Sequence, residues 1–228
     1  MTHVAREGRG RHRKALPIVL SREEKARESA EEKAILADFR FPIRDIRFMA
    51  LKSTVFKANV QISDLDRHYY AEHALTLARH PSETDERMMV RLLAFILNAQ
   101  EGLEFGKGLS ADDEPDLWQR DYTGAIGHWI EVGLPEERRL RRASGRADKV
   151  TLYAYGARAP EIWWQNNQRE LNKLDKLSIL RVGEEDSTAL AGLAERTMQL
   201  QATLQDGELW LSAGDGRSVN LRLETIKA

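Results

Sequence analysis

Residues 114–143 read "EPDLWQRDYTGAIGHWIEVGLPEERRLRRA", and the order of elements in this stretch decides the fold. The acid Asp116 follows a proline, and the apolar run at 128–133 predicts a short strand that carries Glu131. Pro135 suits the first position of a helix, and the two glutamates after it favour the positive helix start. The stretch therefore predicts a strand or turn, a second strand and an arginine-rich helix in succession.

The two acids of this stretch are candidate metal ligands. Side chains at i and i+2 of a strand share a face, so Trp129, Glu131 and Gly133 are expected to point the same way. A metal-dependent nuclease needs two carboxylates to hold a hard divalent cation, and a nearby positive side chain to steady the phosphate charge. An Asp, a spacer and Glu-x-Lys meet this need. The chain supplies Asp116 and Glu131, but Gly133 stands at the place of the lysine.

The segment before this stretch predicts two strands and a helix. Side chains at 54–62 alternate as in a half-buried strand, and residues 68–80 form either a second strand, which is preferred, or a helix. Ser82 can cap a helix, and Asp85, three residues later, can complete a capping box. The apolar residues of this helix follow a period of about 3.6. They are expected to face the core: Met89, Leu92, Leu93 and Ile96.

The segment after the stretch adds further strands and helices and ends in a meander of strands. Asp206-Gly207 and the glycines around Asp215 supply its turns. The other expected elements are a strand at 149–156, a helix at 160–174, a strand at 177–182 and a helix at 185–198. This mixture indicates an α+β fold with an α/β-like core, in which helices flank one mixed central sheet with added antiparallel strands.

Composition narrows the class of protein. The 228 residues are 42% hydrophobic and 31% charged and include no cysteine, which excludes disulfides, thiolate metal sites and cysteine nucleophiles. No apolar run approaches the roughly 20 residues that a membrane span needs, and "ALPIVL" at 15–20 is too short for a signal peptide. We therefore expect a soluble, cytoplasmic protein with no membrane partner.

Charge divides the chain near Met49. Residues 1–48 hold 12 lysines and arginines against 8 acids, whereas residues 49–228 hold 23 against 28, so the body is acidic. The first segment has a basic head and then many helix formers with little apolar periodicity, which predicts a poorly ordered or helical extension. Residues 49–228 are expected to form a single domain. A nucleic-acid site on this domain would need a local basic patch or a bound metal.

Residues 1 to about 46 are expected to be dispensable for folding, because they lack the apolar periodicity that would bury them. A chain that begins at Met49 should therefore melt at nearly the temperature of the full chain, as followed by circular dichroism. A drop of many degrees would show that the extension packs on the body.

Several stretches of the body resemble the YaeQ family. They are "RHYYAEHALTLARHPSETDERMMVRLLAF", "LEFGKGLS", "EPDLW", "WIEVGLPEERRLRRASGRA", "YAYG" and "LAERTMQLQATLQDGELWLS", which lie between Met49 and about Leu223. The resemblance implies a variant of the PD-(D/E)XK nuclease-like fold with an αβββαβ core. It places Asp116 and Glu131 on the metal-binding positions and implies that an acid of the first core helix, Glu86 or Glu83, joins them. Gly133 departs from the pattern and leaves the role of the lysine unfilled.

Two nearby residues are candidates for that missing role. Lys149 begins the next strand and could act as a base or stabilise charge, whereas Arg138, on one helix face with Arg142, could only stabilise charge. The competing interpretation of residues 138–146 is a solvated helix face. The candidate catalytic residues are thus Asp116, Glu131, Lys149 and Arg138, and the candidate metal ligands are Asp116, Glu131 and Glu86.

Two functions are compatible with these residues. The first is a Mg²⁺- or Mn²⁺-dependent phosphodiesterase that acts on nucleic acid. The second is a catalytically inactive binding module of the same fold that contacts nucleic acid or a transcription or repair protein.

Overall fold

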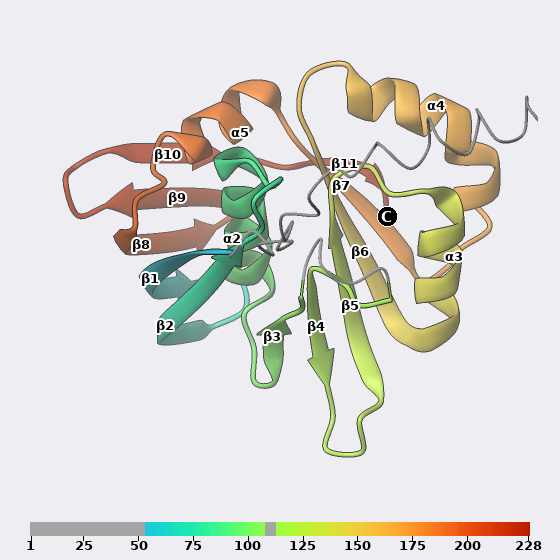
Figure 1. The fold of residues 1–228 in the computed structure, drawn as a ribbon, viewed down its shortest axis with the longest axis horizontal. Helices are drawn as coiled ribbons and strands as arrows, with labels where there is room; N and C mark the ends of the chain where they lie inside the picture. The colour runs from blue at the N-terminus through green and yellow to red at the C-terminus, as the bar shows by residue number, and fades with distance from the viewer. Residues whose placement is uncertain (1–52, 108–112) are drawn as a thin grey trace, which may run out of the picture. The chain divides into compact units, whose positions relative to one another are not determined.

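The computed structural model describes residues 53–107 and 113–228, and the predicted extension at 1–48 lies outside them. The described part contains both strands and helices (Figure 1). The strands are β1 (Thr54–Asp64), β2 (Tyr69–Arg79), β3 (Leu103–Phe105), β4 (Leu117–Arg120), β5 (Ile126–Val132), β6 (Ala147–Tyr155), β7 (Leu177–Val182), β8 (Thr197–Gln205), β9 (Glu208–Ala213), β10 (Ser218–Leu221) and β11 (Glu224–Lys227). The helices are α2 (Asp85–Asn98), α3 (Glu137–Arg146), α4 (Ala159–Leu171) and α5 (Glu184–Ala191).

The first sheet has the strand order β10-β9-β8-β1-β2. The alternation at 54–62 is confirmed, since β1 buries Phe56, Ala58, Val60 and Ile62. Residues 69–79 form the preferred strand, β2, which pairs with β1 in antiparallel fashion. On its other side β1 pairs with β8 in parallel, so the expected C-terminal meander completes the sheet that the first strands begin.

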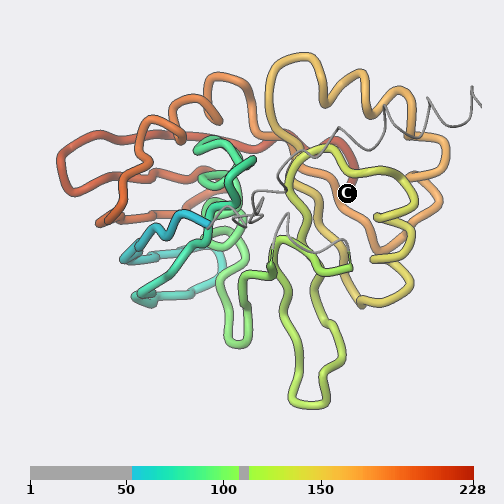
Figure 2. The backbone as a smooth tube through the Cα atoms, in the orientation of Figure 1, coloured from blue at the N-terminus to red at the C-terminus, as the bar shows by residue number. Residues whose placement is uncertain are grey.

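The second sheet has the order β11-β7-β6-β5-β4-β3, with β5, β6 and β7 parallel and β3, β4 and β11 antiparallel to their neighbours. The order α2-β3-β4-β5-α3-β6 follows the expected αβββαβ arrangement. The α+β class with mixed pairing is confirmed, but the expectation of one central sheet is wrong. Figures 1 and 2 show the C-terminal segment crossing from the first sheet to the second, where β11 pairs with β7.

Helix α2 lies between the two sheets (Figures 1 and 2). Its expected core face is confirmed but incomplete, because all nine residues from Met88 to Ile96 are buried. The core around α2 includes Val60 and Leu200 of the first sheet and Ile130 of the second. A separate core lies where α3 and α4 cover the other face of the second sheet. Its residues include Trp129, Leu140, Val150, Leu152 and Leu171.

Several expected boundaries need correction. Thr84 rather than Ser82 caps α2, because Thr84 Oγ1 accepts from the Arg87 amide at 3.1 Å. Helix α3 begins at Glu137, so Pro135 precedes the helix. Helix α5 ends at Ala191 instead of 198, because the residues from 197 onward alternate in burial and pair with β1. Within 53–107 and 113–228, no helix has both the length and the apolar character needed to cross a membrane.

Candidate functional site at the end of strand β5

The two predicted acids lie together at the end of β5. Leu117, the first residue of β4, pairs with Ile130, and the Asp116 amide donates to the Ile130 carbonyl at 3.1 Å. This antiparallel register places Asp116 beside Glu131. Both are buried, with 2% and 3% of their surfaces exposed. Buried charges need partners, and the structure supplies a different set for each acid.

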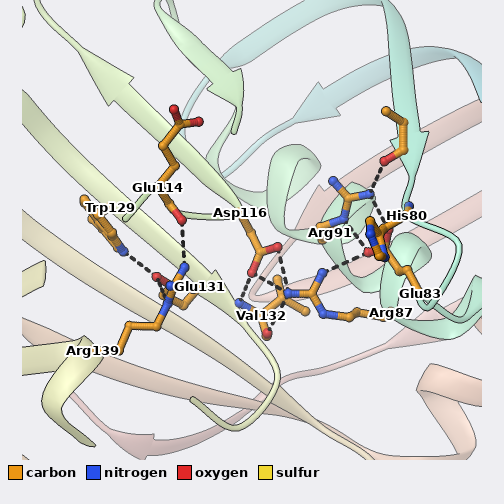
Figure 3. Close-up of polar contacts among 11 residues, drawn as sticks. His80, Glu83, Arg87, Arg91, Glu114, Asp116, Trp129, Glu131, Val132 and Arg139 are labelled. Atoms are coloured by element: carbon orange, nitrogen blue, oxygen red, sulfur yellow. Dashed lines mark hydrogen bonds and ion pairs between the residues drawn. The ribbon is translucent and has the colours of Figure 1, made fainter. Parts of the chain in front are cut away.

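Asp116 is bound by an arginine of α2 and by the strand beside it (Figure 3). Arg87 Nη2 lies 2.8 Å from Asp116 Oδ1 and 2.9 Å from Oδ2. The Val132 amide donates to Asp116 Oδ2 at 2.8 Å. Arg87 Nη2 also lies 3.3 Å from the Val132 carbonyl oxygen. Asp116 and Arg87 together therefore hold both backbone polar groups of Val132.

The same arginine connects Asp116 to a second buried acid, Glu83. Glu83 Oε1 accepts from Arg87 Nη1 at 2.9 Å and from Arg91 Nε at 2.7 Å. Arg91 Nη2 donates to Glu83 Oε2 at 2.9 Å. These four residues form a buried ion-pair chain in the order Arg91, Glu83, Arg87 and Asp116 (Figure 3). Sequence reasoning missed both arginines, although their spacing of four residues from Glu83 and from each other would place them on one side of a helix.

Glu131 has its own partners on the side of α3. Its Oε1 accepts from Trp129 Nε1 at 2.7 Å, which confirms that side chains at i and i+2 share a face here, and from Arg139 Nε at 2.8 Å. Arg139 Nη2 also donates to the Glu114 carbonyl at 2.7 Å. Burial raises the pKa of Glu131 to about 7, and the negative charge of Asp116 adds to this, against the opposing effects of Arg139 and Trp129.

Lys149 does not reach Glu131. It pairs with His128 across β5 and β6, and His128, an odd number of residues from Glu131, lies on the opposite face of β5. Burial lowers the pKa of His128 to about 4, and the charge of Lys149 contributes to this shift. Arg139 occupies the position beside Glu131 that was expected for Lys149 or Arg138. The structure therefore supplies a positive partner for Glu131, but one that cannot act as a base.

Arg138 lies at the surface and not against either acid. Its Nε is 2.5 Å from Glu136 Oε2, and the two side chains are 76% and 70% exposed. Arg138, Arg139 and Arg142 of α3 line, with Glu136, a hollow of about 410 Å³. We call it the arginine hollow. Arg138 and Arg142 were expected to share one face of the helix, and both line this hollow.

Glu86 also lies apart from Asp116. Its Oε1 accepts from Ser187 Oγ of α5 at 2.6 Å. Glu83, the other acid considered for this role, is the one that connects to Asp116, through Arg87. The difference follows from the helix start: Glu83 precedes the cap and turns inward, whereas Glu86 lies in the first turn.

Backbone conformation explains the glycine at the place of the lysine. Gly133 has φ 104°, a left-handed conformation that side chains with a Cβ rarely adopt. Its amide donates to the Tyr153 carbonyl at 2.9 Å, which fixes the turn at the end of β5. A lysine at this position would be strained even though the nearest atom to its Cβ, Tyr155 Cε1, is 4.0 Å away.

Comparison with known proteins places the chain in a family. The model of the family described as YaeQ protein matches residues 49–222. The chain belongs to the YaeQ family. "Uncharacterized protein YaeQ" of Escherichia coli (strain K12) is 51% identical over 164 residues, which cover 72% of this chain and 91% of that protein. The protein of the same name from Salmonella typhi is 51% identical over 176 residues, which cover 77% and 96%.

Two crystal structures of YaeQ proteins share the fold. The one from Xanthomonas axonopodis pv. citri has a TM-score of 0.74 and 48% identity, and the match covers 77% of this chain and 99% of that one. The one from Pseudomonas syringae has a TM-score of 0.73 and 35% identity, with 77% and 97% covered. The resemblance to the YaeQ family is confirmed. These names assign no activity.

The acids of this YaeQ family chain do not fit a divalent metal ion as they are arranged here. Arg87 engages both carboxylate oxygens of Asp116, and Arg139 engages Oε1 of Glu131, so each acid already has a positive partner where Mg²⁺ or Mn²⁺ would bind. Across residues 53–107 and 113–228, no three His, Asp or Glu side chains are grouped so that they could hold a metal. The arrangement suits charge neutralisation within the protein better than coordination of a metal.

Proposed function

We propose that the chain binds the phosphate groups of nucleic acid in the arginine hollow of α3, without cleaving it. The observation that carries this proposal is the concentration of positive charge there: α3 has five arginines and one acid in ten residues, on a body whose balance is acidic. Guanidinium groups match phosphate oxygens in pairs of parallel hydrogen bonds, so three of them around one hollow suit a phosphate backbone.

The arginines of the hollow differ in how firmly they are held. Arg139 is anchored by Glu131 and the Glu114 carbonyl, so this part of the lining is fixed. Arg138 is paired with exposed Glu136, and ion pairs in water contribute little, so phosphate can displace that partner. Among the described residues, no hydrogen bond or ion pair engages the exposed Arg142. Arg138 and Arg142 can therefore turn to a ligand at small cost.

Metal-dependent cleavage is the second function to test, since the family resemblance suggested it. It would require Asp116 and Glu131 to exchange arginine for Mg²⁺ or Mn²⁺, and it lacks the lysine that Gly133 replaces. Lys149, which could serve as a base, lies in β6 on the face of the second sheet opposite to Glu131. We therefore favour binding over turnover.

Arg142→Ala is expected to weaken binding of labelled oligonucleotides about 3- to 10-fold and to reduce the salt slope of log K by about 0.7 to 0.9, the loss of one phosphate contact. Fluorescence anisotropy with single-stranded DNA, double-stranded DNA and RNA at two salt concentrations measures both quantities. Arg138→Ala should act in the same way. The matched control is Arg141→Ala, which removes the same charge from the same helix. Arg141 pairs with Glu137 and is not among the residues that line the hollow, so its loss should leave binding nearly unchanged.

Three results would contradict the proposal. If Arg141→Ala weakens binding as much as Arg142→Ala, the general charge of α3 and not the hollow is responsible. If the wild-type chain binds none of the three oligonucleotides, a protein partner becomes the better hypothesis for this surface. If it cleaves them with Mg²⁺ or Mn²⁺ and Glu131→Gln abolishes the cleavage, the chain is a nuclease.

A further inference from the structure

We propose that Arg87 is the resident cation of the acidic site, a fixed positive group in the place where Asp116 and the end of β5 would otherwise hold a divalent metal ion. This role of Arg87 in the buried ion-pair chain does not depend on whether the arginine hollow binds nucleic acid.

The surroundings of Arg87 Nη2 are those of a cation site. Three oxygens surround this one nitrogen: Asp116 Oδ1 at 2.8 Å, Asp116 Oδ2 at 2.9 Å and the Val132 carbonyl at 3.3 Å. Carboxylate and backbone carbonyl oxygens are the ligands that hard divalent cations prefer. The same oxygens cannot bind a metal while the guanidinium group lies among them.

Arg87 is held firmly in this position. Its other terminal nitrogen donates to Glu83, which Arg91 holds in turn, and only 14% of the Arg87 side chain is exposed. Burial acts to lower the pKa of Arg87, but the charges of Asp116 and Glu83 outweigh it and raise the pKa above its already high ordinary value. The group is thus charged at every physiological pH. Its departure would leave Asp116 and Glu83 buried without this partner.

Arg87 also acts as a positioning residue for the end of β5. The Val132 carbonyl accepts from Arg87, and the Val132 amide donates to Asp116, which Arg87 neutralises. Helix α2 is in this way tied to the last residue of β5, immediately before the left-handed turn at Gly133. A metal ion entering this position would have to replace both the charge and this connection.

The test is a Mn²⁺ titration of the full chain by isothermal calorimetry, with thermal unfolding in parallel. The wild-type chain is expected to show no saturable Mn²⁺ binding and no Mn²⁺-dependent rise in Tm. Arg87→Ala opens the three oxygens and should bind one Mn²⁺ saturably, which wild type does not, with a Tm that rises with Mn²⁺. Adding Asp116→Asn to Arg87→Ala should abolish this binding.

Arg91→Ala is the matched control, because it removes an arginine from the same helix and from the same Glu83 without touching Asp116. It should gain no Mn²⁺ site. If Arg87→Ala does not fold, wild type is compared with Arg87→Lys, which keeps the positive charge and should also bind no Mn²⁺. Stoichiometric Mn²⁺ binding by wild type that Asp116→Asn abolishes would overturn the proposal. A folded Arg87→Ala that binds no more Mn²⁺ than Arg91→Ala would overturn it equally.

Discussion

Glu83→Ala is expected to lower the free energy of unfolding by about 3–5 kcal/mol, the scale found when one partner of a buried ion pair is removed. Glu83 is the acid between two arginines, and the Arg91 side chain is only 3% exposed. Without Glu83, Arg91 keeps the Ala78 carbonyl as a partner but loses this ion pair. Urea unfolding followed by circular dichroism gives the difference from wild type.

Glu86→Ala is the matched control for this prediction. Glu86 lies one turn further along and, within the described part of the chain, makes one hydrogen bond, to Ser187, so its loss should cost about 1 kcal/mol. The double substitution Glu83→Leu with Arg91→Met removes acid and base together and should recover at least half of the stability that Glu83→Ala loses, because no charge is then left stranded at Arg91. Equal costs for Glu83→Ala and Glu86→Ala would show that the ion-pair chain is not a buried unit.

The protonation of His128 and that of Glu131 are expected to change the free energy of unfolding in opposite directions. Their effects should cancel in the wild-type chain between pH 4.5 and 6.5. The pKa of His128 is about 4 in the folded chain against an ordinary 6.5, so its contribution to stability is lost as pH falls through this range. The pKa of Glu131 is about 7 against an ordinary 4.5, so its contribution is lost as pH rises through the same range. Each slope is about 1.4 kcal/mol per pH unit, with opposite sign.

Single substitutions should reveal each slope by removing the other. Glu131→Gln leaves His128, and its unfolding free energy should fall by about 3 kcal/mol relative to pH 7 as pH drops to 4. His128→Gln leaves Glu131, and its stability should fall by about 3 kcal/mol as pH rises from 4.5 to 7. Urea unfolding at half-unit pH steps measures both curves. Parallel curves for the two variants would contradict the assignment of the shifts to these residues.

Local sequence patterns predicted many of the strands and helices of this fold. They did not predict which strands far apart in the sequence pair with each other. The alternation of β1 and the run at 177–182 predicted strands that the structure contains. Nothing in the segment 197–205 indicates that it pairs in parallel with β1, more than a hundred residues earlier, so the division of the strands into two sheets was not expected. Sheet membership depends on which apolar faces meet, and spacing along the chain does not record it.

The site was predictable to the same degree. The spacing of Asp116 and Glu131 in the sequence predicted that they lie close together. Neighbouring antiparallel strands place them side by side. It could not choose among the neighbouring arginines of α3, since that choice depends on where the helix starts and how it is rotated. The helix buries Leu140 and Ala143, which directs Arg139 to Glu131 and leaves Arg138 at the surface. Lys149 was misplaced because its face on β6 follows from the register with His128.

The position of α2 has a consequence for how the molecule unfolds. Nine successive residues of this helix are buried between the two sheets, and they pack in one hydrophobic core with residues of both. If one sheet separated, the core of the other would therefore be exposed. The two sheets are therefore expected to lose their structure in one cooperative transition, with the amides of α2 among the last to exchange with solvent. Arg87 and Arg91 lie in this same helix, so the charges of the site belong to the most cooperative part of the chain.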